Sequence, residues 1–481
     1  MATVHAVEGD FLYEEIASQV ATLINDATLK PGERIPSVRQ MSAERGVSIS
    51  TVLQAYRLLE DRGLIEARPQ SGYYVRKRLQ ERVIVPECSQ PPRSSTPVSV
   101  TSLILDVYER VNHPDYVPFG AAVPSPELLP TEELSRAMAR VARREAADTM
   151  TYLLSQGSPK LREAIARRTL LWGGQFNRDD VIVTSGCTEA LALGLRTVAR
   201  PGDTIAIESP TYFGVLQLID SLGMKALEFP TDPTSGVRLD ELERVLKAGG
   251  VRACLFAPNF NNPLGSLMPD ERKEALVEML ARYGIPLIED DLYGDLYFGV
   301  SRPMPAKAFD KAGMVLYCGS FSKTISPGYR IGWIIPGRFL QDVKRLKYAS
   351  TISSSSPAQY AIASYLEGSG YERHLRRLRG AVERGIAHAT DAVCRYFPEG
   401  TRVTRPQGGF VLWVELPERV DAVQLFHEAL RAHITIAPGP IFSASGSFTH
   451  FIRLNCGHPW SDRMEQALEQ IGQIVYRMLR E

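Results

Sequence analysis

The feature that most constrains the fold of this chain is a series of short apolar runs between residues 115 and 355. Most of these runs are separated by amphipathic segments long enough to form a helix, such as residues 269–283. The runs read VIVTSG, TIAIES, ACLFAP, IPLIED, MVLYCGS and IGWIIP. Apolar strands that alternate with helices are typical of a largely parallel sheet covered by helices on both faces. We therefore predict an α/β domain over residues 115–355.

The pattern changes after this domain. Residues 356–481 combine long helical segments with isolated strands such as GGFVLWVEL and HFIRLNC. This mixture predicts a smaller α+β lobe at the end of the chain. A chain of 481 residues is also too long for one ordinary core, so several domains are expected.

The first 82 residues predict a separate unit of three helices and a hairpin. Apolar residues recur at helical spacing from Leu12 to Ile24, and Ser37 and Gly46 supply the start and stop signals of a second helix. A third helix buries a stripe formed by Val52, Ala55, Tyr56 and Leu59. Two β-prone runs around a Pro-Gln-Ser-Gly turn follow it. Three helices and a hairpin make a winged helix-turn-helix.

Charge and composition restrict the binding partners. Lys and Arg balance Asp and Glu at 55 each, so any attraction to DNA must be local. Within residues 30–82 basic side chains outnumber acidic ones. The following segment, residues 83–114, contains VPECSQPPRSSTPVSV from residue 85 to residue 100, whose Pro and Ser content predicts a linker.

Cysteine and hydropathy patterns indicate the compartment. The six cysteines include no C-x-x-C pair, and no histidines are spaced as metal ligands, so we expect neither a disulfide framework nor a metal site. Without a signal peptide or an apolar run that could span a bilayer, we expect a cytoplasmic protein with no membrane partner.

Polar side chains follow four of the apolar runs in the predicted sheet. Ligands of open parallel α/β sheets bind outside the carboxyl ends of the strands, so these side chains should meet there. They are Thr188, Asn262, Asp290, Tyr293, Ser320, Ser322, Lys323 and Arg330. A lysine for a Schiff base, a carboxylate for a pyridine nitrogen and a phosphate cradle are what pyridoxal phosphate requires. The set therefore predicts this cofactor.

Each predicted role has a physical reason. The small residues that open a helix at Cys187 and Thr188 leave free N–H groups for a phosphate, with Ser320, Ser322 and Arg330 completing the cradle. Lys323 would carry the cofactor. Asp290 would hold the pyridine nitrogen, with Asp291 as the alternative, and Asn262 and Tyr293 would stabilise the ring oxygen. Taken singly, Lys323, Arg330 and the acidic pair are more often solvated or paired surface charges.

From residue 115 onward, a set of motifs in order extends this prediction. They are YLLSQGSPKLREAIARR, SGCTEAL, SPTYFG, PNFNNPLG, EDDLYGDL, SFSKTISPGYRIGW, QGGFVLWVEL and FIRLNC. In these motifs the chain resembles the aminotransferase-like, fold-type-I pyridoxal phosphate enzymes. The resemblance implies the cofactor roles above, and it also implies Tyr212 stacked on the ring. Arg453 would hold the α-carboxylate of a ligand, Asn262 would also contact that ligand, and Tyr152 would reach the phosphate of a second subunit in a homodimer. Ordinary aromatic packing is the alternative for Tyr212 and Tyr152.

The front end carries a second set of motifs, LYEEIASQVATLI and LKPGERIPSVRQMSAERGVSISTVLQAYRLLEDRGLIEARPQSGYYVR. Here the chain resembles the GntR-type winged helices. By analogy Arg39, Ser48, Ser50, Thr51, Gln54 and Arg57 approach the DNA major groove or its phosphates, and Arg68, Gln70, Ser71 and Gly72 form the wing tip. Many relatives carry arginine where this chain has Val52 and Leu53, which implies thinner base readout. Solvated surface charge is the alternative for Arg57 and Arg68.

Fused in this order, the two parts resemble the MocR-type subfamily of GntR regulators. The resemblance implies a homodimeric regulator of a double-stranded DNA operator that senses an amino acid or amine through aldimine exchange at Lys323. Two alternatives remain open. One is a working aminotransferase that acts on an α-amino acid. The other is a regulator that responds to pyridoxal phosphate alone, in which Arg453 would have no carboxylate to hold.

Overall fold

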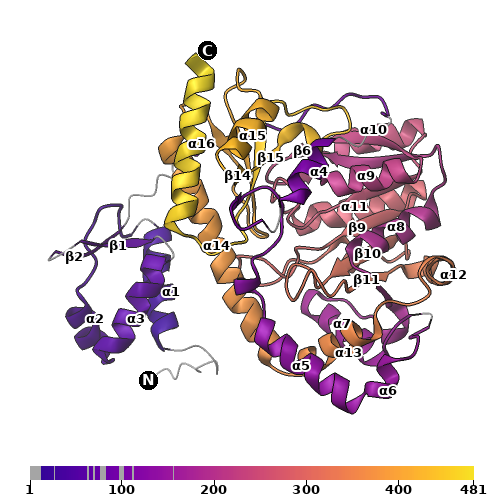
Figure 1. The fold of residues 1–481 in the computed structure, drawn as a ribbon, viewed down its shortest axis with the longest axis horizontal. Helices are drawn as coiled ribbons and strands as arrows, with labels where there is room; N and C mark the ends of the chain where they lie inside the picture. The colour runs from indigo at the N-terminus through magenta and orange to yellow at the C-terminus, as the bar shows by residue number, and fades with distance from the viewer. Residues whose placement is uncertain are drawn as a thin grey trace. The chain divides into compact units, whose positions relative to one another are not determined.

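In the computed structural model the chain divides into two units, residues 1–83 and residues 84–481 (Figure 1). The structure describes residues 12–26, 28–61, 64–68, 71–75, 83–96, 102–110, 113–154 and 156–480. Within the described residues, no helix is both long enough and apolar enough to cross a bilayer.

The first unit is the predicted winged helix-turn-helix. Its elements are α1 (Leu12–Asn25), α2 (Val38–Arg45), α3 (Ile49–Asp61) and the hairpin strands β1 (Ile65–Arg68) and β2 (Gly72–Val75). Ser37 caps α2 by accepting from the Gln40 N–H, and Gly46 ends the helix with a left-handed φ of 66°. The predicted stripe of α3 is fully buried, and the Tyr56 hydroxyl donates to Pro36 O at 2.6 Å.

The second unit is built on an eight-stranded sheet. Its order is β4 (Ile182–Thr184), β11 (Gly332–Ile335), β10 (Val315–Ser320), β9 (Leu287–Asp290), β8 (Ala253–Phe256), β5 (Thr204–Ser209), β6 (Lys225–Asp232) and β7 (Gly236–Val237). The strands β10, β9, β8, β5 and β6 pair in parallel, which confirms the predicted mostly parallel sheet. The last apolar run, β11, is antiparallel to both of its neighbours.

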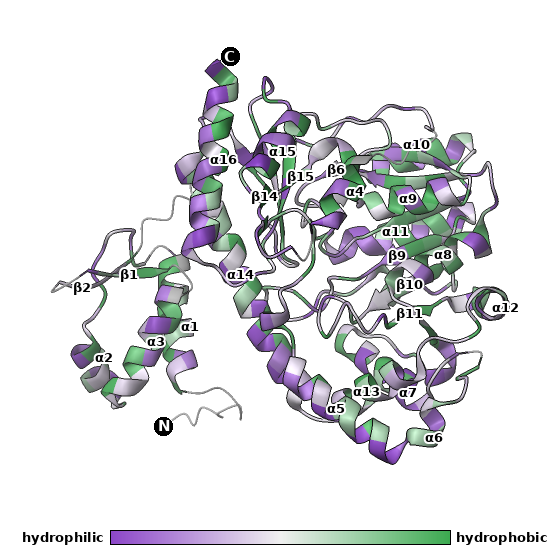
Figure 2. Ribbon diagram, in the orientation of Figure 1, coloured by the Kyte–Doolittle hydropathy of each residue, from purple (hydrophilic) through white to green (hydrophobic). Residues whose placement is uncertain are grey.

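Helices cover both faces of this sheet. One face packs against α8 (Cys187–Val198), α9 (Phe213–Ser221) and α12 (Leu340–Ser350). The other face packs against α5 (Thr131–Arg144), α7 (Pro159–Thr169), α10 (Leu239–Ala248), α11 (Asp270–Tyr283) and α13 (Ser356–Leu366). Figure 2 shows the consequence, since apolar colour fills the central strands and the helices carry both colours.

The C-terminal lobe contains a four-stranded antiparallel sheet. Its order is β12 (Arg402–Val403), β13 (Val411–Glu415), β16 (Phe451–Asn455) and β15 (Ala437–Pro438). The lobe's helices are α14 (Gly370–Tyr396), α15 (Ala422–Arg431) and α16 (Asp462–Arg480). This α+β composition was predicted. A short parallel pair joins β14 (Ile434–Thr435) to β3 (Val117–Pro118), so the lobe is tied to the early part of the second unit.

Short helical turns complete the second unit. They are α6 (Ala146–Thr149), η2 (Pro126–Leu128), η3 (Leu170–Trp172), η4 (Arg178–Asp180), η5 (Ala306–Phe309), η6 (Gly337–Phe339) and η7 (Gly439–Phe442).

The segment predicted to be a linker contains ordered structure. Ser89 donates to Ser209 O at 2.5 Å, and Thr96 N donates to Ala226 O at 2.8 Å. Further along, α4 (Ser102–Glu109) buries Ile104 and Val107. The described residues of 84–110, which we call the connecting segment, therefore belong to the second unit by their contacts.

Candidate functional site

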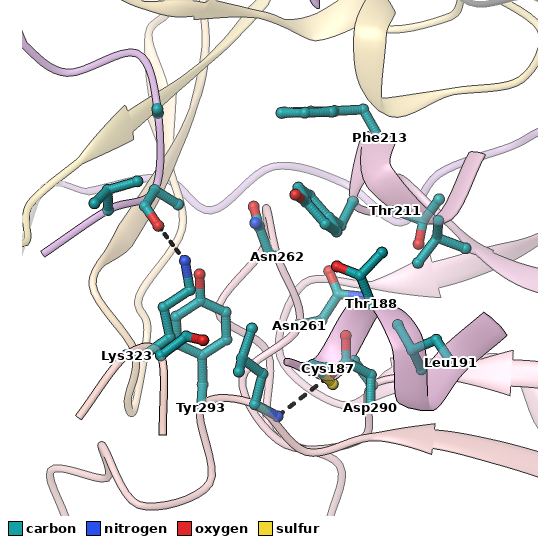
Figure 3. A pocket seen from close by; sticks show the side chains of 18 of the residues that line it. Cys187, Thr188, Leu191, Thr211, Phe213, Asn261, Asn262, Asp290, Tyr293 and Lys323 are labelled. Carbon is teal, nitrogen blue, oxygen red and sulfur yellow. Dashed lines mark hydrogen bonds between the residues drawn. The ribbon is translucent and has the colours of Figure 1, made fainter. Parts of the chain in front are cut away.

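A cavity of about 210 Å³ lies at the carboxyl ends of the central strands (Figure 3). Most of the residues predicted from the strand ends and motifs line it together. They are Cys187, Thr188, Tyr212, Asn262, Asp290, Tyr293, Ser322, Lys323 and Arg330. Parallel strands bring their carboxyl ends to one edge, which explains why residues so distant in sequence meet here.

Lys323 follows β10 and points into the cavity, where its ammonium donates to Ala122 O at 2.5 Å (Figure 3). Loss of water and the nearby guanidinium of Arg453 lower the pKa of Lys323 to about 8, although Asp290 opposes the shift. A lysine with this pKa is partly neutral near physiological pH. The neutral amine is the form that attacks a carbonyl.

Asp290 ends β9 on the face of the sheet that packs against α8. Its carboxylate accepts from Leu292 N at 3.2 Å and lies 3.4 Å from the Cys187 thiol. Burial raises the pKa of Asp290 to about 6. Because side chains alternate along an extended chain, Asp291 points to the opposite side.

Asp291 is fully engaged away from the cavity. Its carboxylate accepts from the Arg302 guanidinium at 2.5 Å, from the Tyr317 hydroxyl at 2.8 Å and from Asn259 Nδ2 at 2.9 Å. Of the two acids left open by the sequence, Asp290 is the one that lines the cavity.

The start of α8 has the features of an anion site. Gly186 precedes the helix with φ 84° and provides no side-chain cap for the first N–H groups, and Cys187 and Thr188 of the first turn line the cavity. A Cβ on Gly186 would collide with the Arg330 guanidinium, which donates to Ser185 O at 3.1 Å. In the first turn of α8, Glu189 forms an ion pair with Lys347, whose Nζ lies 2.8 Å from Glu189 Oε2. A phosphate would therefore meet donors and cations here.

Ser320 contributes differently from its predicted role. Its hydroxyl bonds the Ser322 hydroxyl at 2.8 Å and donates to Ile331 O at 2.9 Å, and it does not line the cavity. It positions Ser322 from behind.

Two tyrosines stand around the cavity. The Tyr293 ring packs edge-on against Phe410 at 5.3 Å, and burial raises the pKa of Tyr293. The Tyr212 ring occupies the space where Gly214 lacks a side chain. In Figure 3 the side chains of Tyr293 and Lys323 overlap in the view, and Asn262 is drawn above them.

Arg453, on β16, is completely buried beside the cavity wall. Its guanidinium donates to Gly120 O and contacts Asn262 Oδ1 at 3.5 Å. Among the described residues it forms no ion pair with a carboxylate, and its Nε has no hydrogen-bond partner. Burial lowers the pKa of Arg453. A buried cation with spare donors suits a small anion such as a carboxylate.

The sequence analysis missed four cavity-lining residues with polar side chains: Tyr108, Glu208, Thr211 and Asn261. Burial raises the pKa of Glu208 to about 7, and its carboxylate accepts from Ala257 N at 2.8 Å and Asn261 Nδ2 at 2.7 Å. Glu208 lies near the end of the apolar run TIAIES, so the strand-end argument could have found it. Tyr108 lies in the predicted linker, where no such argument applied.

Tyr152 is 74% exposed and does not line the cavity. Its predicted contact with a second subunit stays a prediction.

In the first unit, α3 exposes Ser50, Gln54 and Arg57, which lie on one helical face. Ser48 lies at the start of α3, where its hydroxyl accepts from Thr51 N at 3.1 Å. Arg39 is exposed on α2 and Thr51 is half-buried.

Two side chains of the predicted wing tip, Arg68 and Ser71, are engaged in contacts within the hairpin. Arg68 pairs with Glu66 at 2.8 Å and lies 4.3 Å from the centre of the Tyr74 ring. Ser71 bonds the Tyr74 hydroxyl at 2.6 Å, Gly72 begins β2, and Gln70 lies outside the described residues.

Comparison with known proteins identifies both units. Residues 119–471 match the family model for class I and II aminotransferases, and residues 12–75 match that of bacterial regulatory proteins of the gntR family. The HTH-type transcriptional regulators YdcR and YjiR of Escherichia coli K12 are each 40% identical to this chain, over 97% of it and 99% of their own length. This chain belongs to the MocR-type GntR regulators.

A solved structure agrees with the fold of the second unit of this MocR-type protein. LysN, the α-aminoadipate aminotransferase of Thermus thermophilus, is 28% identical with a TM-score of 0.73. The match covers 80% of the MocR-type chain and 96% of LysN, which was crystallised with N-(5'-phosphopyridoxyl)-L-leucine.

Proposed function

We propose that this protein is a pyridoxal phosphate-dependent, DNA-binding transcriptional regulator whose second unit senses an amino acid or amine. One observation carries the proposal. The cavity that brings Lys323, Asp290 and the start of α8 together is part of the same chain as a winged helix-turn-helix. The kinship with YdcR and YjiR supports a regulator rather than an enzyme that acts alone.

The donor set fits pyridoxal phosphate, the cofactor of the aminotransferase family. When bound, this cofactor supplies a carbonyl that captures primary amines and a ring that withdraws electrons. Lys323 would provide the amine that holds it, and Asp290 would provide the anion beside the ring nitrogen. Cys187, Thr188, Ser322 and Arg330 would hold the phosphate at the start of α8. Tyr212 would cover the ring face, and Asn262 and Tyr293 would donate to the ring oxygen.

Arg453 favours an amino acid over a plain amine as the ligand. Its guanidinium is buried beside Asn262, and no ion pair with a carboxylate joins it among the described residues. A ligand carboxylate would supply the missing charge. This argument also counts against a regulator that responds to the cofactor alone.

The regulator acts as a cytoplasmic homodimer in this proposal. Exposed Tyr152 would complete the phosphate site of the partner subunit, and two copies of α3 would read two half-sites of an operator. A ligand shifts such a dimer only as far as it binds one arrangement better than the other.

A second function has support from the same residues. Lys323, Asp290 and Arg453 are all in place, so an aminotransferase acting on an α-amino acid is the competing proposal. Neither Asp290 nor Lys323 is replaced by a residue that would prevent transamination.

One titration separates these functions. The visible absorbance of the cofactor-loaded protein is followed while each proteinogenic amino acid is added, with and without a 2-oxo acid. A spectral change that one compound produces and that then persists supports the sensor. Continuous release of a new keto acid supports the aminotransferase. If no amino compound changes the spectrum, the sensing proposal is wrong.

A further inference from the structure

We propose that Tyr108 is a ligand-contacting residue of the cavity, and that through it the bound amino acid fixes the position of the connecting segment that leads to the DNA-binding unit. This inference rests on the proposed function. Tyr108 lies outside both family matches, which end at residue 75 and begin at residue 119.

Tyr108 reaches the cavity from the last turn of α4. Its hydroxyl lies 2.8 Å from the hydroxyl of Tyr212, and its ring packs edge-on against Phe213 with centroids 5.5 Å apart. The side chain lines the cavity and is still 41% exposed, so it is not a core residue. It stands at the boundary between the cavity and water.

The pair of hydroxyls has a spare donor. One hydrogen is used between Tyr108 and Tyr212, and the second remains available because each phenol carries its own. The Arg453 guanidinium lies close enough to both phenols to interact with them electrostatically. A donor pair beside a buried guanidinium is suited to an anionic group. We therefore assign the Tyr108–Tyr212 pair to the ligand carboxylate, together with Arg453.

The connecting segment is held at the same place in the fold. The end of β5 leads into α9 through residues 209–213, which we call the β5–α9 turn. Thr211 and Tyr212 of this turn line the cavity. Ser89 donates to Ser209 O in the same turn, and Tyr108 bonds Tyr212. Two points of the connecting segment, nineteen residues apart, thus depend on one cavity-lining turn.

The helix α4 packs against the rest of the second unit on one side only. Ile104 is buried in a cluster with Phe213 of the large domain and with Trp413 and Phe442 of the C-terminal lobe. On the other side of the helix, Leu105 is 58% exposed. A helix anchored by one apolar stripe can shift when the hydrogen bond at its end changes partner. A ligand that engages Tyr108 therefore acts on the chain that enters from the DNA-binding unit.

The first test is a matched pair of variants. Tyr108→Phe removes the hydroxyl, and Tyr476→Phe removes one from a tyrosine of similar exposure on α16. Both variants should retain the cofactor spectrum. In titrations with the proteinogenic amino acids, Tyr108→Phe should weaken binding of the active compound about tenfold, while Tyr476→Phe should leave it unchanged.

The second test is hydrogen exchange on the cofactor-loaded full chain. Saturation with the active amino acid should slow amide exchange in peptides covering residues 84–96 and 102–109. In Tyr108→Phe, at ligand concentrations that restore saturation, this protection should be lost.

The outcomes separate the two proposals. If no amino acid changes the spectrum of the wild-type protein, the proposed function fails. If the wild type responds but Tyr108→Phe binds equally well, the assignment of Tyr108 is overturned and the sensor remains. Loss of affinity without any exchange response in the connecting segment would overturn the coupling to the DNA-binding unit.

Discussion

The lowered pKa of Lys323 is a consequence of where the side chain stands. It has lost contact with water and lies near Arg453 and Arg330, and only Asp290 favours its charged form. At pH values below about 8 most of this lysine is protonated and cannot attack a carbonyl. Its position therefore sets the pH range in which it can hold the cofactor.

We expect the rate of cofactor loading to rise with pH through a midpoint near 8. Apoprotein mixed with pyridoxal phosphate at a series of pH values would show this in stopped-flow absorbance. A midpoint near 10.5, the ordinary value for lysine, would contradict the burial argument. Lys323→Ala should show no absorption band of the lysine-linked cofactor at any pH.

Asp290 and Asp291 give a second prediction, because they are neighbours with opposite environments. Asp290 is a buried carboxylate whose pKa is raised from 3.8 to about 6, so the apoprotein loses stability as pH rises from 3.8 to about 6, and the full loss persists at neutral pH. Asp290→Asn should raise the unfolding free energy of the apoprotein at neutral pH by up to about 3 kcal/mol and weaken cofactor binding.

Asp291→Asn should instead lower the unfolding free energy of the apoprotein. It leaves the buried Arg302 guanidinium with a weaker partner, which should cost about 3 kcal/mol of stability. Urea unfolding of both apoproteins, followed by cofactor titration, measures both effects. Equal effects of the two substitutions on stability would show that the two environments are not distinct.

The sequence indicated most cavity residues because they follow strand ends. It left Asp290 and Asp291 open, since which of two adjacent acids faces a cavity depends on the register of β9 between its neighbours. Tyr108 could not be predicted, because it meets Tyr212 only through folding across 104 residues. Such long-range contacts leave no local pattern.

At the scale of elements, α3 is the helix that its sequence pattern describes. Its buried stripe was predicted from helical spacing, and Ser50, Gln54 and Arg57, which were predicted to face DNA, are exposed. The structure also shows why α2 begins and ends where it does, through Ser37 and Gly46. The apolar composition of β11 did not specify whether this strand runs parallel or antiparallel to its neighbours, because buried strands of both kinds have such a composition.

Arg57→Ala should weaken DNA binding without changing the cofactor spectrum. If Arg57 contacts a phosphate, its loss should reduce the salt dependence of binding by about one unit of slope for any duplex. Anisotropy of a labelled random-sequence duplex at several salt concentrations measures this, with Arg345→Ala of α12 as the control. A changed cofactor spectrum would mean that Arg57 has a structural role instead.

For the whole molecule, the prediction concerns its oligomeric state. We expect a homodimer of twice the chain mass of 53.4 kDa, which sedimentation velocity would detect. Tyr152→Phe should leave the dimer intact and weaken binding of pyridoxal phosphate about tenfold, with little effect on pyridoxal, which lacks the phosphate. Equal losses for both compounds would mean that Tyr152 does not touch the phosphate.

The connecting segment has a consequence for protein engineering. A chimaera that joins a foreign winged helix to the aminotransferase-like unit at residue 119, where the family match begins, would discard Ser89 and Tyr108. Such a fusion would keep the residues that hold the cofactor, but it would lose α4 and β3, bind the ligand more weakly and no longer transmit its binding. A junction placed before Ile84 keeps the contacts with the β5–α9 turn. For building biosensors, the useful part of this protein is therefore longer than residues 119–471, which match the aminotransferase family model.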